Sequence, residues 1–167
     1  MPRVESTVTV ELPIEQAFWV SQTRGEVRRR WDPFIRSQHL MDGAVRPDTG
    51  VRTKTRSRHG LAMVSEYVSF RPPTQVGMVM VGGPWFFANF SGGWSFRRLG
   101  PERTEAIWRY TFRVRPSLLQ PIADPIGIRL LGGDIERRIA AYAAACEDPT
   151  VVEAAQADLD DLDDPHP

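Results

Sequence analysis

IRLLGGDIERRIAAYAAAC, residues 128–146, is the most regular amphipathic stretch of the chain. Its large apolar residues recur every three or four positions: Ile128, Leu131, Ile135, Ile139, Tyr142 and Cys146. That spacing predicts a helix with one apolar stripe, off which Arg129, Glu136, Arg137 and Arg138 are expected to remain in water. At Gly132-Gly133 the helix either bends or restarts with Asp134 as N-cap, and the unbroken phase of the stripe favours a bend.

The chain before this helix has the alternating pattern of β-strands. Strands are predicted at 4–12, 36–41, 51–58, 61–70, 76–80, 87–99 and 106–114. Two short helices are predicted after the first strand, at 14–21 and 26–30, with Pro13 at the start of the first. A one-sided helix must cover its stripe with another layer, so we expect one curved antiparallel sheet around it.

Composition and length indicate one ordinary globular domain. The chain has 167 residues, of which 41% are hydrophobic and 25% charged. It contains no apolar run of the roughly 18 residues that a membrane-spanning helix needs, and no apolar signal core near Met1, so a cytoplasmic location is the simplest interpretation. Cys146 is the only cysteine, and its place on the stripe predicts a buried hydrophobe.

Charge divides the chain unevenly. Residues 1–146 hold 21 basic and 13 acidic residues, a net charge of +8, whereas 147–167 hold eight acidic residues and no Lys or Arg. The Asp-rich end predicts an acidic flexible tail over 149–167, after a domain at 1–148.

Two motifs near the N-terminus carry a family resemblance. They are VELPIEQAFW at 10–19 and RRWDP at 29–33, and the order of strands, Val68–Pro73, the glycine-rich hairpins and Ala145-Cys146-Glu147-Asp148 agree with them. Together they resemble the START-like helix-grip superfamily (SRPBCC), which includes polyketide cyclase/dehydrase and lipid transport proteins. The resemblance implies an α+β helix-grip fold with a seven-stranded curved antiparallel sheet around a long C-terminal helix and two short helices after strand 1. It also implies an internal cavity for an apolar small molecule.

The inward faces of the predicted elements give the expected ligand-binding residues. These are Trp31, Val64, Glu66, Val68, Met78, Met80, Trp85, Phe87, Phe90, Trp94, Phe96, Trp108, Tyr110, Phe112, Leu131, Ile135, Ile139 and Tyr142. Aromatic and aliphatic walls with few polar groups are typical of small-molecule pockets, although each such residue can equally be core packing. Trp85-Phe86-Phe87 follows a Gly-Gly-Pro turn and is either a hydrophobic lip or a folded-back plug.

Two functions follow from this set. The first is binding of a hydrophobic small molecule, lipid-like or polycyclic. The alternative is a polyketide aromatase/cyclase or dehydratase, with Glu66, Tyr110, Arg109 and His39 as candidate catalytic residues. A carboxyl of Glu66 facing the cavity would have a raised pKa and could act as general acid or base, unless a bulge inverts the strand or an arginine pairs with it.

Other partners have weaker signals. His39, His59 and His166 are not spaced as a metal set, and we expect no metal and no cofactor. A face formed by Arg52, Lys54, Arg56 and Arg58 allows peripheral contact with an anionic membrane, or is the solvent side of the sheet. The acidic tail could screen this face. No specific nucleic-acid partner is expected, and the sequence sets no oligomeric state.

Overall fold

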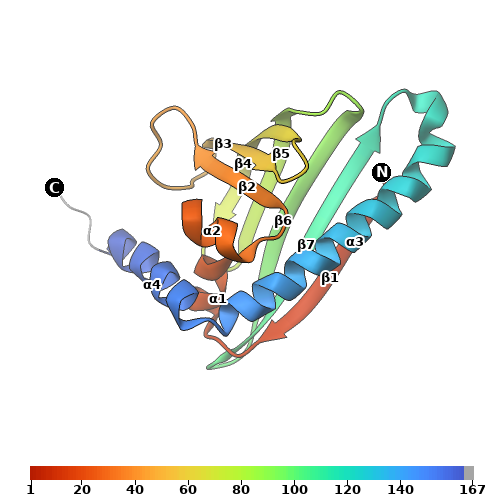
Figure 1. The fold of residues 1–167 in the computed structure, drawn as a ribbon. Coiled ribbons are helices and arrows are strands. Elements are labelled where there is room, and N and C mark those ends of the chain that lie inside the picture. The colour runs from red at the N-terminus through yellow and green to blue at the C-terminus, as the bar shows by residue number, and fades with distance from the viewer. Residues whose placement is uncertain (164–167) are drawn as a thin grey trace.

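The structure is a computed structural model that describes residues 1–163. Its centre is one antiparallel sheet in the order β1-β7-β6-β5-β4-β3-β2 (Figure 1). The strands are β1 (Arg3–Val10), β2 (Ile35–Leu40), β3 (Arg52–Ser57), β4 (Ala62–Arg71), β5 (Gln75–Gly82), β6 (Phe87–Gly100) and β7 (Arg103–Val114). Strands β2 to β7 follow one another as neighbours, and β1 closes the order beside β7. The sheet curls around a long helix, so the predicted helix-grip fold is confirmed.

Two short helices and one long helix accompany the sheet. Helices α1 (Ile14–Ser21) and α2 (Gly25–Trp31) separate β1 from β2, as predicted. The long helix α3 (Gln120–Cys146) lies along β1 and β7 and is preceded by a short 3-10 turn, η1 (Ser117–Leu119). It begins at Gln120, earlier than the predicted Ile128, and runs unbroken through Gly132-Gly133, so Asp134 is not an N-cap. No helix within residues 1–163 is long and apolar enough to cross a lipid bilayer.

The C-terminal half of α3 is packed solidly into the sheet. Ile135, Ile139, Tyr142 and Cys146 are buried, whereas Ile128 at the start of the predicted stripe is 43% exposed. The Trp94 ring stacks on Trp108 with centroids 4.2 Å apart and meets Tyr142 at 4.8 Å. At this end the side chains of the helix and the sheet are therefore in direct contact.

The predicted flexible tail is a helix in the structure. Helix α4 (Pro149–Asp163) packs against α1, with Val151 and Ala155 1% and 0% exposed. Sequence reasoning missed it because the many aspartates obscured an apolar stripe at Val151, Ala155 and Leu159, spaced one helical turn apart. Residues 164–167, including His166, lie outside the described residues.

Strand β4 is rotated relative to the prediction. Ser65 and Tyr67 are buried on the inner face, whereas Val68 is 51% exposed. Glu66 lies on the outer side and pairs with Arg52, with Oε2 3.1 Å from Nε. The predicted inner face assumed unbroken alternation from Val64 to Phe70, but the pairing with β5 shifts register between Tyr67 and Ser69. This β-bulge returns only Phe70 to the core.

Candidate functional site

A pocket of about 650 Å³ opens between the sheet and the N-terminal half of α3. Its size is within the range of small-molecule sites, roughly 300–1,000 Å³. It is lined by the inner faces of β2 to β7, by the junction of α1 with α2, and by α3 from Ala123 to Arg138. The α3 helix thus has two overlapping parts: it borders the pocket from Ala123 to Arg138, and its apolar face packs on the sheet from Ile135 to Cys146.

One wall of the pocket is apolar and aromatic. Eight of the residues expected from the sequence lie there: Met78, Met80, Phe87, Phe90, Trp94, Trp108, Tyr110 and Leu131. They come from β5, β6 and β7, on adjacent strands, and from the facing side of α3. Gly92 allows the Tyr110 ring to lie against β6, because a Cβ there would stand 2.9 Å from Cδ1 of Tyr110.

The other expected lining residues lie elsewhere. Those in the packed core are Trp31, Phe96, Phe112, Ile135, Ile139 and Tyr142. Those turned away from the pocket by the rotation of β4 are Val64, Glu66 and Val68. Trp85 is 77% exposed, and Phe86 lines the pocket in its place. These predictions failed because a periodic pattern identifies the inward face of an element but not the distance to the element opposite.

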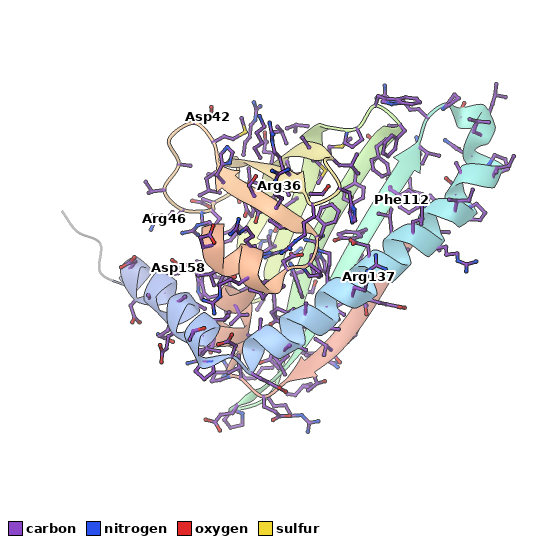
Figure 2. All side chains as sticks on the ribbon, in the orientation of Figure 1. Arg36, Asp42, Arg46, Phe112, Arg137 and Asp158 are labelled. Atoms are coloured by element: carbon purple, nitrogen blue, oxygen red, sulfur yellow. The ribbon has the colours of Figure 1, made fainter. Side chains whose placement is uncertain are left out.

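Phe112 illustrates how closely the helix approaches the sheet. Its ring is fully buried between β7 and α3 (Figure 2). A Cβ added to Gly127 would stand 2.6 Å from the Phe112 ring, so only glycine allows this contact. The contact brings α3 against β7 at Phe112, whereas Trp108, Tyr110 and Val114 of the same strand still border the pocket.

The opposite wall carries hydroxyl groups. Thr53, Thr55, Ser57 and Ser65 line the pocket and are between 1% and 8% exposed. The Thr55 hydroxyl accepts a hydrogen bond from Gln38 Nε2 at 3.1 Å. The sequence held a signal for this wall, since these Thr and Ser residues of β3 alternate with its cationic residues. The pocket is therefore amphipathic, with rings on one side and hydroxyls on the other.

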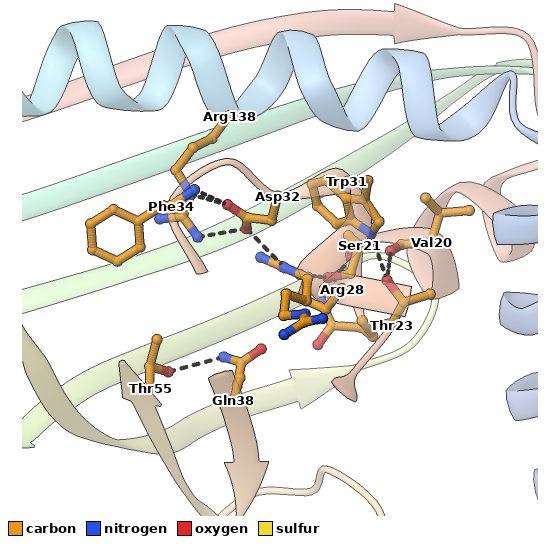
Figure 3. Close-up of polar contacts among 12 residues, drawn as sticks. Val20, Ser21, Thr23, Arg28, Trp31, Asp32, Phe34, Gln38, Thr55 and Arg138 are labelled. Carbon is orange, nitrogen blue, oxygen red and sulfur yellow. Dashed lines mark hydrogen bonds and ion pairs between the residues drawn. The ribbon is translucent and has the colours of Figure 1, made fainter. Parts of the chain in front are cut away.

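A buried ion cluster lies between α2 and α3 at the side of the pocket (Figure 3). The Asp32 carboxylate is fully buried and accepts hydrogen bonds from Arg28 Nε at 2.9 Å and from Arg138 Nε and Nη2 at 3.0 and 2.8 Å. The backbone N–H of Phe34 donates to it at 3.0 Å, as expected for a turn cap. Arg138 is 7% exposed, so its predicted place in water is wrong.

The electrostatics of the cluster keep all three groups charged. Burial alone would raise the pKa of Asp32, but the charges of Arg28 and Arg138 and the hydrogen bonds it accepts lower it to about 2. The Arg138 guanidinium also lies 4.3 Å from the centre of the Trp108 ring, and that of Arg28 lies 4.4 Å from the Trp31 ring. Arg138, whose position in the sequence predicted a solvent-facing side chain, therefore forms a buried ion pair that links α3 to Asp32 at the end of α2.

The four candidate catalytic residues do not form one constellation. Tyr110 lines the pocket, its hydroxyl accepts a hydrogen bond from Arg138 Nη1, and burial raises its pKa. His39 also lines the pocket but is exposed on β2. Glu66 is on the outer face, and Arg109 pairs with Glu5 at 2.7 Å on the outer side of β7. Only Tyr110 and His39 border the same space.

The acidic C-terminal segment lies beside the first two helices. Asp158 Oδ1 is 3.6 Å from Arg24 Nη2, and Asp148 Oδ2 is 3.9 Å from Arg30 Nη2. On β3, Arg52 pairs instead with Glu66 of β4. The ion pairs of the described part of the acidic segment thus give no support to the hypothesis that it screens the cationic face of β3.

The fold and pocket define a START-like helix-grip protein. The sequence model of the family described as "Polyketide cyclase / dehydrase and lipid transport" matches residues 1–147, so the chain belongs to that family. No curated protein sequence matches the chain.

Solved structures resemble this fold at low sequence identity. A START superfamily protein from Mycobacterium smegmatis superposes with a TM-score of 0.74 at 18% identity, covering 88% of this chain and 98% of that one. The Zhui aromatase/cyclase from Streptomyces sp. R1128 gives 0.64 at 17% identity and covers 94% of both chains. The di-domain aromatase/cyclase StfQ of the steffimycin biosynthetic pathway gives 0.66 at 16% identity, covering 87% of this chain and 50% of that one. At such identities the likeness shows the fold alone.

Proposed function

We propose that this protein binds a hydrophobic small molecule, lipid-like or polycyclic, in the pocket beside the N-terminal half of α3. The observation that carries the proposal is a space of about 650 Å³ bordered by stacked rings and methionines. Burying apolar surface against such walls contributes roughly 25 cal/mol per Å². The hydroxyl wall on β3 and β4 adds hydrogen-bonding groups that would orient a ligand carrying oxygen atoms.

A titration with the neutral probe N-phenyl-1-naphthylamine tests the proposal. Met80 faces the pocket, and the next residue, Val81, is 49% exposed on the outer face of the same strand. Met80→Trp fills the pocket with an indole, whereas Val81→Trp adds the same ring outside. We expect saturable binding by the wild type and by Val81→Trp, and at least tenfold weaker binding by Met80→Trp. Equal effects of the two substitutions, or no saturable binding, would reject the proposal.

The second candidate is the aromatase/cyclase or dehydratase function, favoured by Tyr110 and His39 on the pocket wall. Burial raises the pKa of Tyr110, so its hydroxyl stays protonated at neutral pH and can donate a hydrogen bond to a substrate carbonyl but does not act as a base. A β-hydroxyketone incubated with the protein would lose water if this function is present. We expect mass spectrometry to detect the product with wild type and not with Tyr110→Phe. Unchanged ketone with wild type leaves binding alone.

We also propose peripheral contact with an anionic membrane, through a different surface from the cationic strand. Four exposed apolar residues follow one another every fourth position along η1 and α3: Leu118, Ile122, Ile126 and Leu130. Ile126 and Leu130 also border the pocket. Arg113, Arg115 and Arg129 are exposed nearby, and Asp124 is the one acid between 113 and 133. An apolar stripe with flanking cations is typical of helices at lipid interfaces.

Flotation with vesicles tests this contact. Wild type is expected to float with phosphatidylserine vesicles and to lose binding as salt rises from about 50 to 500 mM. Ile122→Ser should reduce flotation, while the matched control Val45→Ser, at an 86% exposed site in the loop after β2, should not. A concentration-dependent dimer in place of vesicle binding would show that the stripe is covered by a second copy.

A further inference from the structure

We propose that the ligand is an amphiphile with a carboxylate group, and that Arg24 at the junction of α1 and α2 binds this carboxylate while the apolar body extends toward Phe87 and Phe90. This inference rests on the proposed function and names the chemical class of its ligand. It concerns an end of the pocket that none of the predicted catalytic residues occupies.

Arg24 has an unused hydrogen-bond donor. Its Nη1 is buried and has no hydrogen-bond partner within the described residues. The Nη2 of the same group stands 3.6 Å from Asp158 Oδ1, beyond hydrogen-bond distance. A guanidinium has five N–H donors, and leaving one buried without an acceptor costs free energy. Because Arg24 also lines the pocket, a rotation of its guanidinium toward that space would bring Nη1 to a ligand oxygen and give this donor its missing acceptor.

The neighbours of Arg24 suit an anion. Arg28, Gln22 and Tyr67 line the same end of the pocket. Burial raises the pKa of Tyr67, while the positive charges of Arg28 and Arg24 act on it in the opposite direction, which places its hydroxyl in the field of both guanidinium groups. The Tyr67 hydroxyl therefore remains protonated near neutral pH and can donate a hydrogen bond. Guanidinium, phenol and amide groups together form a polar end suited to a carboxylate.

The charge balance favours the same ligand class. Among the described residues that line the pocket there are four arginines, Arg24, Arg28, Arg137 and Arg138, and one carboxylate, Asp134. Arg28 and Arg138 share the single carboxylate of Asp32. Asp134 lies 3.9 Å from Arg137 and 3.8 Å from Arg138. Asp158 of α4 is the acid beside Arg24, so these four arginines face three aspartates and keep an excess of one positive charge.

The rest of the pocket sets the orientation. The α1–α2 junction and the hairpin between β5 and β6 lie far apart, toward opposite ends of the sheet (Figure 1). At the hairpin end the lining is apolar, with Phe86, Phe87 and Phe90. A ligand with one charged end has a single favourable orientation here, because reversing it would remove the carboxylate from water without a partner.

The test compares 1-pyrenebutyric acid with its methyl ester by fluorescence titration of the full-length protein. The two probes share the ring and differ in one charge. We expect the wild type to bind the acid at least tenfold more tightly than the ester, with a preference that shrinks as salt rises. Arg24→Met should bring the two affinities to within twofold, through weaker binding of the acid.

Asp158→Asn provides the matched control. Both substitutions break the same Arg24–Asp158 ion pair, so a purely structural role would move them in the same direction. If Arg24 binds the carboxylate, Asp158→Asn removes a competing anion and the preference for the acid is kept or increased. Thermal unfolding of each variant verifies folding, and the wild-type comparison decides if Arg24→Met does not fold.

The outcomes separate the two proposals. Equal binding of acid and ester by wild type overturns the carboxylate inference and leaves the proposed function standing, as does a preference that survives in Arg24→Met. If neither pyrene probe nor N-phenyl-1-naphthylamine binds, the proposed function itself is wrong and this inference falls with it.

Discussion

Replacing the Asp32 carboxylate by an amide should destabilise the protein more than any surface substitution. In Asp32→Asn the guanidinium groups of Arg28 and Arg138 remain buried side by side, and only Asp134, 3.8 Å from Arg138, is left to offset their charge. Removing one partner of a buried ion pair costs about 3–5 kcal/mol, because the remaining charge is neither hydrated nor compensated. That is a large part of the roughly 5–15 kcal/mol that stabilises a typical domain.

The pH dependence gives a second estimate of the same interaction. The pKa of Asp32 falls from 3.8 to about 2 on folding, and at 1.36 kcal/mol per pKa unit this is roughly 2 kcal/mol. Since the folded pKa is the lower one, the contribution is fully present above about pH 4–5. It is lost as the pH falls through 3.8 toward 2, where the folded carboxylate also takes up its proton.

Urea unfolding at pH 7 and at pH 3 measures both effects. Glu66→Gln is the matched control, because it makes the same change in the partly exposed Arg52–Glu66 pair and should cost less than about 1 kcal/mol. The double variant Asp32→Asn/Arg138→Met should be less destabilised than the sum of its single changes. An Asp32→Asn cost below about 1 kcal/mol at pH 7, or a loss of stability from pH 7 to pH 3 equal to that of wild type, would refute the argument.

Three further predictions concern packing and the thiol. Gly127→Ala should destabilise by roughly 1–3 kcal/mol in thermal melts because of its clash with Phe112, whereas Gly132→Ala, whose Cβ meets nothing closer than 3.9 Å, should be neutral or stabilising; equal effects would contradict this geometry. Val151→Ala should cost roughly 1–3 kcal/mol in urea unfolding if α4 is docked on α1, and no loss would indicate that α4 is not docked. Burial raises the pKa of Cys146 to about 12, so a disulfide reagent should not label native protein at pH 8 and should label it in urea; rapid native labelling would contradict its burial.

The fold was predictable because it depends on periodicity. The apolar stripe from Ile135 to Cys146 and the alternation along β7 each specify one buried face, and the order of elements then leaves few topologies. The motif around Trp31-Asp32-Pro33 added the family. Neither the periodic patterns nor this motif required knowledge of the distances between elements.

The site was less predictable because it depends on local interruptions and on tertiary charge pairing. With a β-bulge after Tyr67, Ser65 and Tyr67 lie on the inner wall in place of the predicted Glu66 and Val68. Arg138 appeared to face water until the structure placed Asp32 of a distant turn beside it. A pattern in one segment does not reveal such a partner.

The most direct test of the pocket is methyl NMR of the five methionines. Met63, Met78 and Met80 line the pocket, and Met1 and Met41 do not, so the protein carries its own internal control. With methyl-labelled methionine and the methyl ester of 1-pyrenebutyric acid, the account predicts ligand contacts and shifted resonances for the three pocket methyls and none for the other two. Shifts at Met1 or Met41 without shifts at Met78 and Met80 would contradict it.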